Sequence, residues 1–207
     1  MNDNFILILT IAILVLVLLF GKILMKSKGF TIDLKVRAFF YKNATKQFKH
    51  MMNMITTLAN VETILIISIP ILFYLISEKM LDKATAIILS VFFSVGISQI
   101  LKFLFRVSRP TKSQEFKYIG YSFPSGHSTV GMAYYLTLAY ILAGGLDGYT
   151  EIVFIGLILG ILIGFSRLVL GVHWFTDVTV GLILGLLCSW WVIKIYSTGY
   201  YINWLFN

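Results

Sequence analysis

Residues 150–170 read TEIVFIGLILGILIGFSRLVL, and this stretch decides the fold class of the chain. A helix needs about 20 predominantly apolar residues to cross the hydrocarbon core of a bilayer. Within lipid, only helices and closed barrels satisfy all of their backbone hydrogen bonds. The stretch therefore predicts a membrane-spanning helix, and the end of that helix carries two polar residues, Ser166 and Arg167.

The composition of the whole chain agrees with this prediction. Its 207 residues are 58% hydrophobic and the mean hydropathy is +0.89, whereas average proteins contain roughly 45–50% apolar residues. We predict an all-α integral membrane protein with six transmembrane helices in a single domain, residues 1–207. Because most of such a chain lies in the bilayer, we do not expect a nucleic-acid partner. The other apolar stretches of span length are 4–24, 56–77, 84–105, 128–146 and 176–197.

Glycines recur at every fourth position in two of these stretches. They are Gly156, Gly160 and Gly164 in one stretch, and Gly181 and Gly185 in the other. Small residues at this spacing let the backbones of neighbouring membrane helices approach closely. We therefore predict tight helix packing along both stretches.

Between the first two spans, residues 26–50 are basic with interleaved leucine, valine and phenylalanine. This pattern predicts a basic amphipathic segment, with a helix lying on the membrane surface; the alternative is a solvated linker. Most of the 17 lysines and arginines lie on the face that carries this segment and the loops after the third and fifth spans. The positive-inside rule would make that face cytoplasmic.

The same face carries a first polar cluster at residues 102–110, KFLFRVSRP. Seven residues are close to two helical turns, so we expect Lys102 and Arg109 to share one helix face, with Arg106 near it. Pro110 disfavours helical backbone at the residue before it, which predicts that the helix ends at Arg109. On its own, this cluster is better explained by cations that reach from the helix to the membrane surface.

A second cluster is YSFPSGHSTV, residues 121–130. Pro124 suits the first turn of a helix, and Gly126 lets a ligand approach the backbone closely. The free amides of Ser125, Gly126 and His127 would then form a helix N-terminus suited to phosphate. Taken alone, a histidine at the position of His127 is more often a structural polar residue than a catalyst.

The third cluster is SRLVLGVHWFTD, residues 166–177. His173 and Asp177 are four residues apart, which predicts that they share a helix face within hydrogen-bonding distance. A carboxylate that accepts from one ring nitrogen leaves the other nitrogen available as a nucleophile. Gly171 offers a break that would bring Arg167 to the same pocket. The alternative is a Trp/His belt at the membrane surface with an aspartate cap.

Together the clusters supply cations, two histidines, a carboxylate and a helix N-terminus on one membrane face. Phosphoryl transfer needs such groups to anchor the phosphate oxygens, to attack phosphorus and to protonate the leaving oxygen. A metal site fits less well, because the surrounding cations would repel a divalent ion.

The three clusters, in this order over residues 102–177, resemble the signature of the type 2 phosphatidic acid phosphatase family. Its parts read K-x6-RP, PSGH and SR-x5-H-x3-D in this sequence. All three parts match without a gap. The chain is small and contains little besides its predicted membrane helices. In this it is similar to bacterial phosphatidylglycerophosphatase B-type enzymes and undecaprenyl-diphosphate phosphatases.

The resemblance implies a metal-independent lipid phosphatase without cofactors or an obligatory protein partner. His173 would attack phosphorus and form a phosphohistidine, Asp177 would orient it, and His127 would act as general acid. The phosphate oxygens would be held by Lys102, Arg109, Ser125, Gly126, Ser166 and Arg167.

The resemblance also implies a multi-pass protein of the cell membrane whose active site lies on the extracytoplasmic face, against the charge count. Cations that hold the phosphate, together with residues 22–49 binding anionic lipid head groups, would account for the basic excess on that face. Glu62, near the start of the second span, matches no motif and has no assigned role.

Other functions remain open at this point. A non-hydrolytic binder or transporter of a phosphorylated lipid needs the cations but not a nucleophile and acid pair, so His127, His173 and Asp177 favour the phosphatase. A lipid phosphotransferase is equally compatible with the residues, whereas a haloperoxidase suits a six-span protein poorly. Phosphatidylglycerophosphate, phosphatidate and undecaprenyl diphosphate are all candidate substrates, because no residue distinguishes their lipid tails.

Overall fold

The computed structural model describes residues 3–26, 29–110, 120–145 and 149–198, and within these ranges the secondary structure is entirely helical. The described helices are α1 (Asp3–Lys26), α2 (Thr31–Asn43), α3 (Lys46–Thr57), α4 (Val61–Ser77), α5 (Leu81–Phe105), α6 (Gly126–Ala143), α7 (Thr150–Val169) and α8 (Phe175–Thr198).

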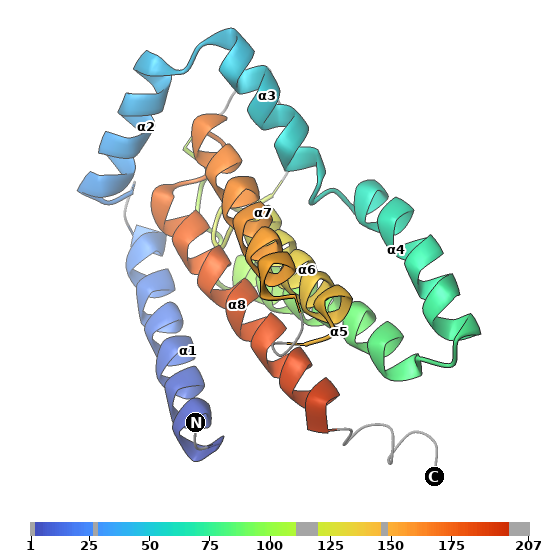
Figure 1. The fold of residues 1–207 in the computed structure, drawn as a ribbon. Coiled ribbons are helices and arrows are strands. Elements are labelled where there is room, and N and C mark those ends of the chain that lie inside the picture. The colour runs from blue at the N-terminus through green and yellow to red at the C-terminus, as the bar shows by residue number, and fades with distance from the viewer. Residues whose placement is uncertain (1–2, 27–28, 111–119, 146–148, 199–207) are drawn as a thin grey trace.

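Helix α6 forms the centre of the bundle and packs against α5, α7 and α8 (Figure 1). Most of its side chains are buried, including those of Tyr134 and Tyr135. Helix α1 runs along one side of the bundle, and α4 lies on the other side next to α5. Helices α2 and α3 lie at the end where α7 finishes and α8 begins, in contact with α7.

The glycine spacing on α7 and α8 allows α6 to approach both helices, which confirms the predicted tight packing. A Cβ atom at Gly156 would lie 2.5 Å from the carbonyl oxygen of Tyr135 on α6. On α8, a Cβ atom at Gly185 would lie 2.6 Å from the carbonyl oxygen of Thr129. These separations are far below van der Waals contact, so a larger residue would push the helices apart.

Among the described helices, α1, α5, α7 and α8 are each long and apolar enough to cross a membrane. The α3–α4 pair, bent by 46°, adds a fifth candidate span. The central helix α6 does not belong to this set. Because α5, α7 and α8 surround it, it can carry polar residues such as the buried Thr129 and Thr137 without exposing them to lipid.

Two predicted boundaries differ from the structure. Residues 26–50 do not form one helix but α2 and the first part of α3, while residues 27–28 lie outside the described ranges. Helix α3 begins separately from α2 because Thr45 is its N-cap. The hydroxyl of Thr45 accepts a hydrogen bond of 3.2 Å from the amide of Phe48. Within the span predicted from residue 56, helix α4 begins only at Val61, after Asn60 as N-cap.

Candidate active site

Lys102 and Arg109 do not share a helix face, contrary to the prediction. Helix α5 ends at Phe105, because Arg106 adopts the left-handed conformation with φ 50° and ψ 35°. Residues 107–109 continue without helical structure, and they bring Arg109 back toward the bundle. Arg106 itself is exposed and stacks over the ring of Phe103, so it does not take part in the site.

The second cluster leads into α6, but not in the predicted way. Pro124 lies outside the helix, because Ser125 is the N-cap and Gly126 is the first helical residue. The amide of Ser125 is not free: it donates a hydrogen bond of 3.0 Å to the carbonyl oxygen of Asp177. This bond ties the start of α6 to the start of α8. The amides that remain for a ligand at this terminus are those of Gly126 and His127.

In the third cluster, Gly171 provides the predicted break with a φ of 66°. It lies in the turn between α7 and α8, so His173 precedes α8 rather than lying on it. The pairing with Asp177 is nevertheless present: His173 Nδ1 lies 3.4 Å from Asp177 Oδ2, and both side chains are buried. Arg167 occupies the last turn of α7 and is only 1% exposed.

These three chain segments surround one cavity of about 370 Å³. A Cβ atom at Gly126 would lie 3.6 Å from Lys102 Nζ, so this cation reaches the start of α6. Ser125 and Ser166 are fully buried and do not line the cavity. The Ser125 hydroxyl accepts from Ser128, and the Ser166 hydroxyl donates to the carbonyl oxygen of Ile163. The predicted site residues that line the cavity are Lys102, Arg109, Gly126, His127, Arg167 and His173.

The two ring nitrogens of His173 have different surroundings. Arg109 Nη1, which can only donate, lies 3.1 Å from His173 Nε2. Nε2 must therefore be the acceptor, which leaves the ring proton on Nδ1, facing the Asp177 carboxylate. Burial, followed by the charges of Arg167, Arg109 and Lys102, holds the pKa of His173 well below its usual 6.5. A neutral His173 with its lone pair on the cavity side is the form that can act as a nucleophile.

Ser122 contributes to this arrangement, although the sequence prediction did not include it. Its hydroxyl donates a short hydrogen bond to Asp177 Oδ2 and lies 3.5 Å from His173 Nδ1. The amide of Trp174 donates to the same carboxylate oxygen at 2.8 Å. Asp177 is thus fixed by two donors besides His173. The only signal for Ser122 in the sequence was its position two residues before Pro124.

The bend between α3 and α4 supplies two more partners that sequence reasoning missed. Thr56 Oγ1 accepts a hydrogen bond of 2.7 Å from Arg167 Nη1. Asn60 Oδ1 lies 3.0 Å from His127 Nε2. The polar residues Thr56, Thr57 and Asn60 at the start of the second apolar stretch could have indicated this break. Glu62 is exposed in the first turn of α4 and does not line the cavity.

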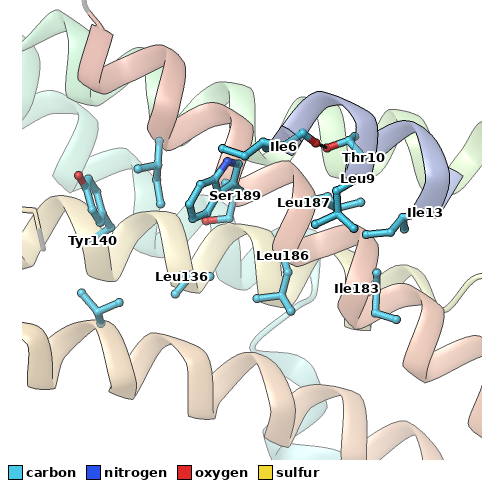
Figure 2. Close-up of a pocket in the computed structure, with 13 residues that line it drawn as sticks. Ile6, Leu9, Thr10, Ile13, Leu136, Tyr140, Ile183, Leu186, Leu187 and Ser189 are labelled. Atoms are coloured by element: carbon cyan, nitrogen blue, oxygen red, sulfur yellow. Dashed lines mark hydrogen bonds between the residues drawn. The ribbon is translucent and has the colours of Figure 1, made fainter. Parts of the chain in front are cut away.

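A second cavity, of about 390 Å³, lies between α1, α6, α7 and α8 and is lined almost entirely by apolar side chains (Figure 2). None of the predicted site residues lines it. Over the ranges that the structure describes, no group of three or more His, Cys, Asp or Glu side chains is placed to hold a metal ion. The titratable groups suited to catalysis gather in the first cavity.

Known proteins with similar sequences are phosphatases by name. An undecaprenyl-diphosphatase of Sulfolobus acidocaldarius is 28% identical over 131 residues, 60% of this chain and 61% of the relative. Phosphatidylglycerophosphatase B of Bacillus subtilis is 35% identical over 95 residues, 44% of this chain and 47% of the relative. The matches thus span between about half and three fifths of the length of these relatives.

Solved structures show the same fold. The crystal structure of a transmembrane PAP2-type phosphatidylglycerolphosphate phosphatase from Bacillus subtilis superposes with a TM-score of 0.76 at 24% identity, covering 89% of this chain and 96% of that one. Aquifex aeolicus LpxE superposes with a TM-score of 0.65 at 24% identity, covering 80% and 96%. The sequence profile of the PAP2 superfamily matches residues 83–201, more than half of the chain and all three clusters. The chain therefore belongs to the PAP2 superfamily.

Proposed function

We propose that this protein is a metal-independent phosphatase that hydrolyses the terminal phosphate of a membrane lipid through a phosphohistidine. The observation that carries this proposal is the placement of His173. Its Nδ1 faces Asp177, its Nε2 faces Arg109, and it lines the same cavity as His127. A nucleophile, its orienting carboxylate and an acid are thus combined with cations that can hold a phosphate.

In the first step, Arg109 Nη1 exchanges its contact with His173 Nε2 for a phosphate oxygen. The freed Nε2 lone pair attacks phosphorus while the bond from phosphorus to the lipid oxygen breaks. The leaving oxygen takes a proton from the His127 imidazolium and departs as the lipid product. Asp177 accepts a hydrogen bond from the Nδ1–H of His173 and stabilises the positive charge that develops on that ring. Three cations line the cavity around His127, so its protonated form needs the negative charge of the bound phosphate.

In the second step, water attacks the phosphorus of the phosphohistidine and gives its proton to the now neutral His127. The bond between phosphorus and nitrogen breaks, its electron pair returns to Nε2, and inorganic phosphate leaves. Lys102, Arg109 and Arg167 are positioned to hold the phosphate oxygens in both steps, together with the amides at the start of α6. Ser125 and Ser166 would join them only after their hydroxyls rotate away from their present partners.

A lipid substrate is supported by the apolar side of the same cavity. Beyond the charged residues, the cavity extends between α4 and α5 along Ile64, Leu65, Val91 and Val95. These four residues also line an adjoining cavity of about 460 Å³ that continues along the same two helices. A phosphate held by the cations could thus keep its hydrocarbon tail in this groove, which offers no group that selects one tail over another.

We also propose six membrane crossings, with α6 and the bent α3–α4 pair joining α1, α5, α7 and α8. The active site would lie on the extracytoplasmic face of the cell membrane, with the basic helices α2 and α3 resting on the lipid head groups there. The polar residues of α6 remain compatible with a crossing because α5, α7 and α8 surround this helix.

The alternatives differ in what happens after binding. A binder or transporter would use the cations alone, and the His173–Asp177 pair would then serve no purpose. A phosphotransferase would use the same first step and pass the phosphoryl group to an acceptor other than water.

The catalytic proposal predicts phosphate release by the purified protein in detergent with EDTA. Phosphatidylglycerophosphate, phosphatidate and undecaprenyl diphosphate are the substrates to compare. His173→Ala should lower the rate by at least about a thousandfold, because it removes the nucleophile. No release from any of the three lipids by folded, lipid-binding protein would favour the binder, whereas a phosphorylated acceptor in place of free phosphate would indicate the phosphotransferase.

The lowered pKa of His173 predicts that its protonation limits kcat/KM only below pH 6.5. Arg109→Gln removes one of the charges that oppose protonation, so the acidic limb of the kcat/KM profile should move upward by about one pH unit. Arg106→Gln is the matched control, since this arginine is exposed outside the site. An unchanged or lower midpoint in Arg109→Gln would contradict the electrostatic assignment.

The groove between α4 and α5 predicts a dependence on chain length. Val95→Trp should lower kcat/KM for a long-chain lipid phosphate by about tenfold or more, since each methylene group excluded from an apolar site costs about 0.8 kcal/mol. A water-soluble phosphate ester should be hydrolysed as before. Ile100→Trp, on the same helix but outside the groove and 67% exposed, is the control. Equal losses with both substrates would place the lipid tail elsewhere.

The proposed orientation predicts the labelling of single cysteines in intact cells. In a Cys188→Ser background, a cysteine at Lys46 should react with a membrane-impermeant maleimide added from outside. A cysteine at Glu78, in the turn between α4 and α5, should react only after the cells are permeabilised. The reverse pattern would put the active site on the cytoplasmic face, as the count of basic residues suggests.

A further inference from the structure

Asp33 is a buried carboxylate that the proposed mechanism does not use. It lies in the first turn of α2 and is only 1% exposed. This helix belongs to the segment between the first two spans, outside residues 83–201 that match the family. A buried carboxylate without hydrogen-bond partners is strongly unfavourable, so the contacts of Asp33 indicate what it does.

Two of the three donors to Asp33 come from one residue of α8. The amide of Thr176 donates to Oδ1 at 2.9 Å, and its hydroxyl donates to Oδ2 at 3.1 Å. The third donor is the amide of Phe30, at 2.8 Å from Oδ2. Asp33 thus connects α2 to the start of α8, across 143 positions of sequence.

These contacts complete the N-terminus of α8. Helix α8 begins at Phe175, so the amides of its first turn have no partner within the helix. Asp177, the third residue, accepts the amide of Trp174 at 2.8 Å, which is one half of a capping box. The other half needs an acceptor on the residue before the helix, and a tryptophan side chain has none. Asp33 instead supplies an acceptor from another helix, for the amide of Thr176, the second residue of α8.

The residue that precedes α8 is also fixed from both sides. The indole nitrogen of Trp174 donates to the carbonyl oxygen of Ser108 at 2.9 Å, next to Arg109. Gly29, with a φ of 96°, lies against the same indole, where a Cβ atom would come within 3.2 Å of the ring. The chain from His173 to Asp177 is therefore held between residues 29–33 and the end of the first cluster.

We propose that Asp33 is a positioning residue for phosphoryl transfer: it holds the N-terminus of α8 and thereby keeps His173 and Asp177 in register with Arg109. The inference rests on the proposed phosphatase function and deepens it. If the start of α8 shifts, the carboxylate of Asp177 and the chain at His173 move together relative to the cations. A misplacement of about 1 Å at a reacting group can cost about a hundredfold in rate.

The test uses the full-length protein and pairs a strong variant with a mild one. Asp33→Ala removes all three acceptor contacts, whereas Thr176→Val removes only the hydroxyl donor and keeps the shape of the side chain. Asp33→Ala should lower kcat by about tenfold to a hundredfold and Thr176→Val by a few fold, with KM changed less than about twofold. In the double variant, Thr176→Val should add nothing to Asp33→Ala, because the contact is already lost.

Two control variants separate positioning from general effects of substitution. Thr179→Val removes a hydroxyl on the same helix that bonds only to the carbonyl oxygen of Phe175. Glu151→Gln neutralises an exposed acid in the first turn of α7. Both should keep wild-type kcat. If folded Asp33→Ala keeps wild-type kcat and loses only thermal stability, Asp33 merely anchors α2 and the inference is overturned.

A second measurement does not depend on turnover. The chain has three histidines, so nitrogen NMR of ¹⁵N-histidine-labelled protein can follow His173, with His173→Ala to assign its signals. Wild-type His173 should carry its proton on Nδ1, and Asp33→Ala should shift this signal or mix the tautomers. An unchanged His173 signal in Asp33→Ala would overturn the inference even if no lipid is hydrolysed. If the wild-type protein hydrolyses none of the lipids but Asp33→Ala still displaces the His173 signal, the proposed function is refuted. The positioning of His173 by Asp33 is then retained.

Discussion

The close approach of α6 to α7 and α8 is the constraint on which the site depends. At Gly181, a Cβ atom would lie 2.8 Å from the carbonyl oxygen of Ser125, so only a glycine allows α8 to pass the start of α6. The hydrogen bond from the Ser125 amide to the Asp177 carbonyl oxygen forms at this crossing. Because α6 begins where α8 begins, His127 and His173 reach the same cavity. Wider helix packing would separate the proposed acid from the proposed nucleophile.

Once the helices are packed, the cations determine the state of the site. Lys102, Arg109 and Arg167 line one cavity at the end of an otherwise apolar bundle. Burial, together with the positive charges of these three residues, favours a neutral His173. The same charges favour a negatively charged ligand. Arg167 is held by Thr56 and Arg109 by backbone carbonyl oxygens, which fixes both guanidinium groups before a ligand binds. A fixed arrangement of this kind stabilises developing charge without reorganising during the reaction.

The helix boundaries show where sequence patterns were insufficient. The spacing of Lys102 and Arg109 suggested a shared helix face, but the left-handed Arg106 ends α5 earlier. Arg109 reaches the site through the non-helical residues that follow α5 instead. His173 and Asp177 were expected on one helix, and they pair although His173 precedes α8. A local spacing rule assumes continuous helix. A helix can end early at a residue with a positive φ, and the packing of the helices can still bring the same side chains together.

By itself, the sequence determined the all-helical membrane class, the close packing at glycines and the residue types of the three clusters, because hydropathy and spacing are local properties. Only the tertiary structure decided which groups complete the site. Ser122 reaches Asp177, and Asn60 reaches His127 from a different helix pair. Asp33 is 143 residues away from the helix start that it caps. No periodicity links such positions, since their contacts arise when separate helices pack and leave buried donors that need acceptors.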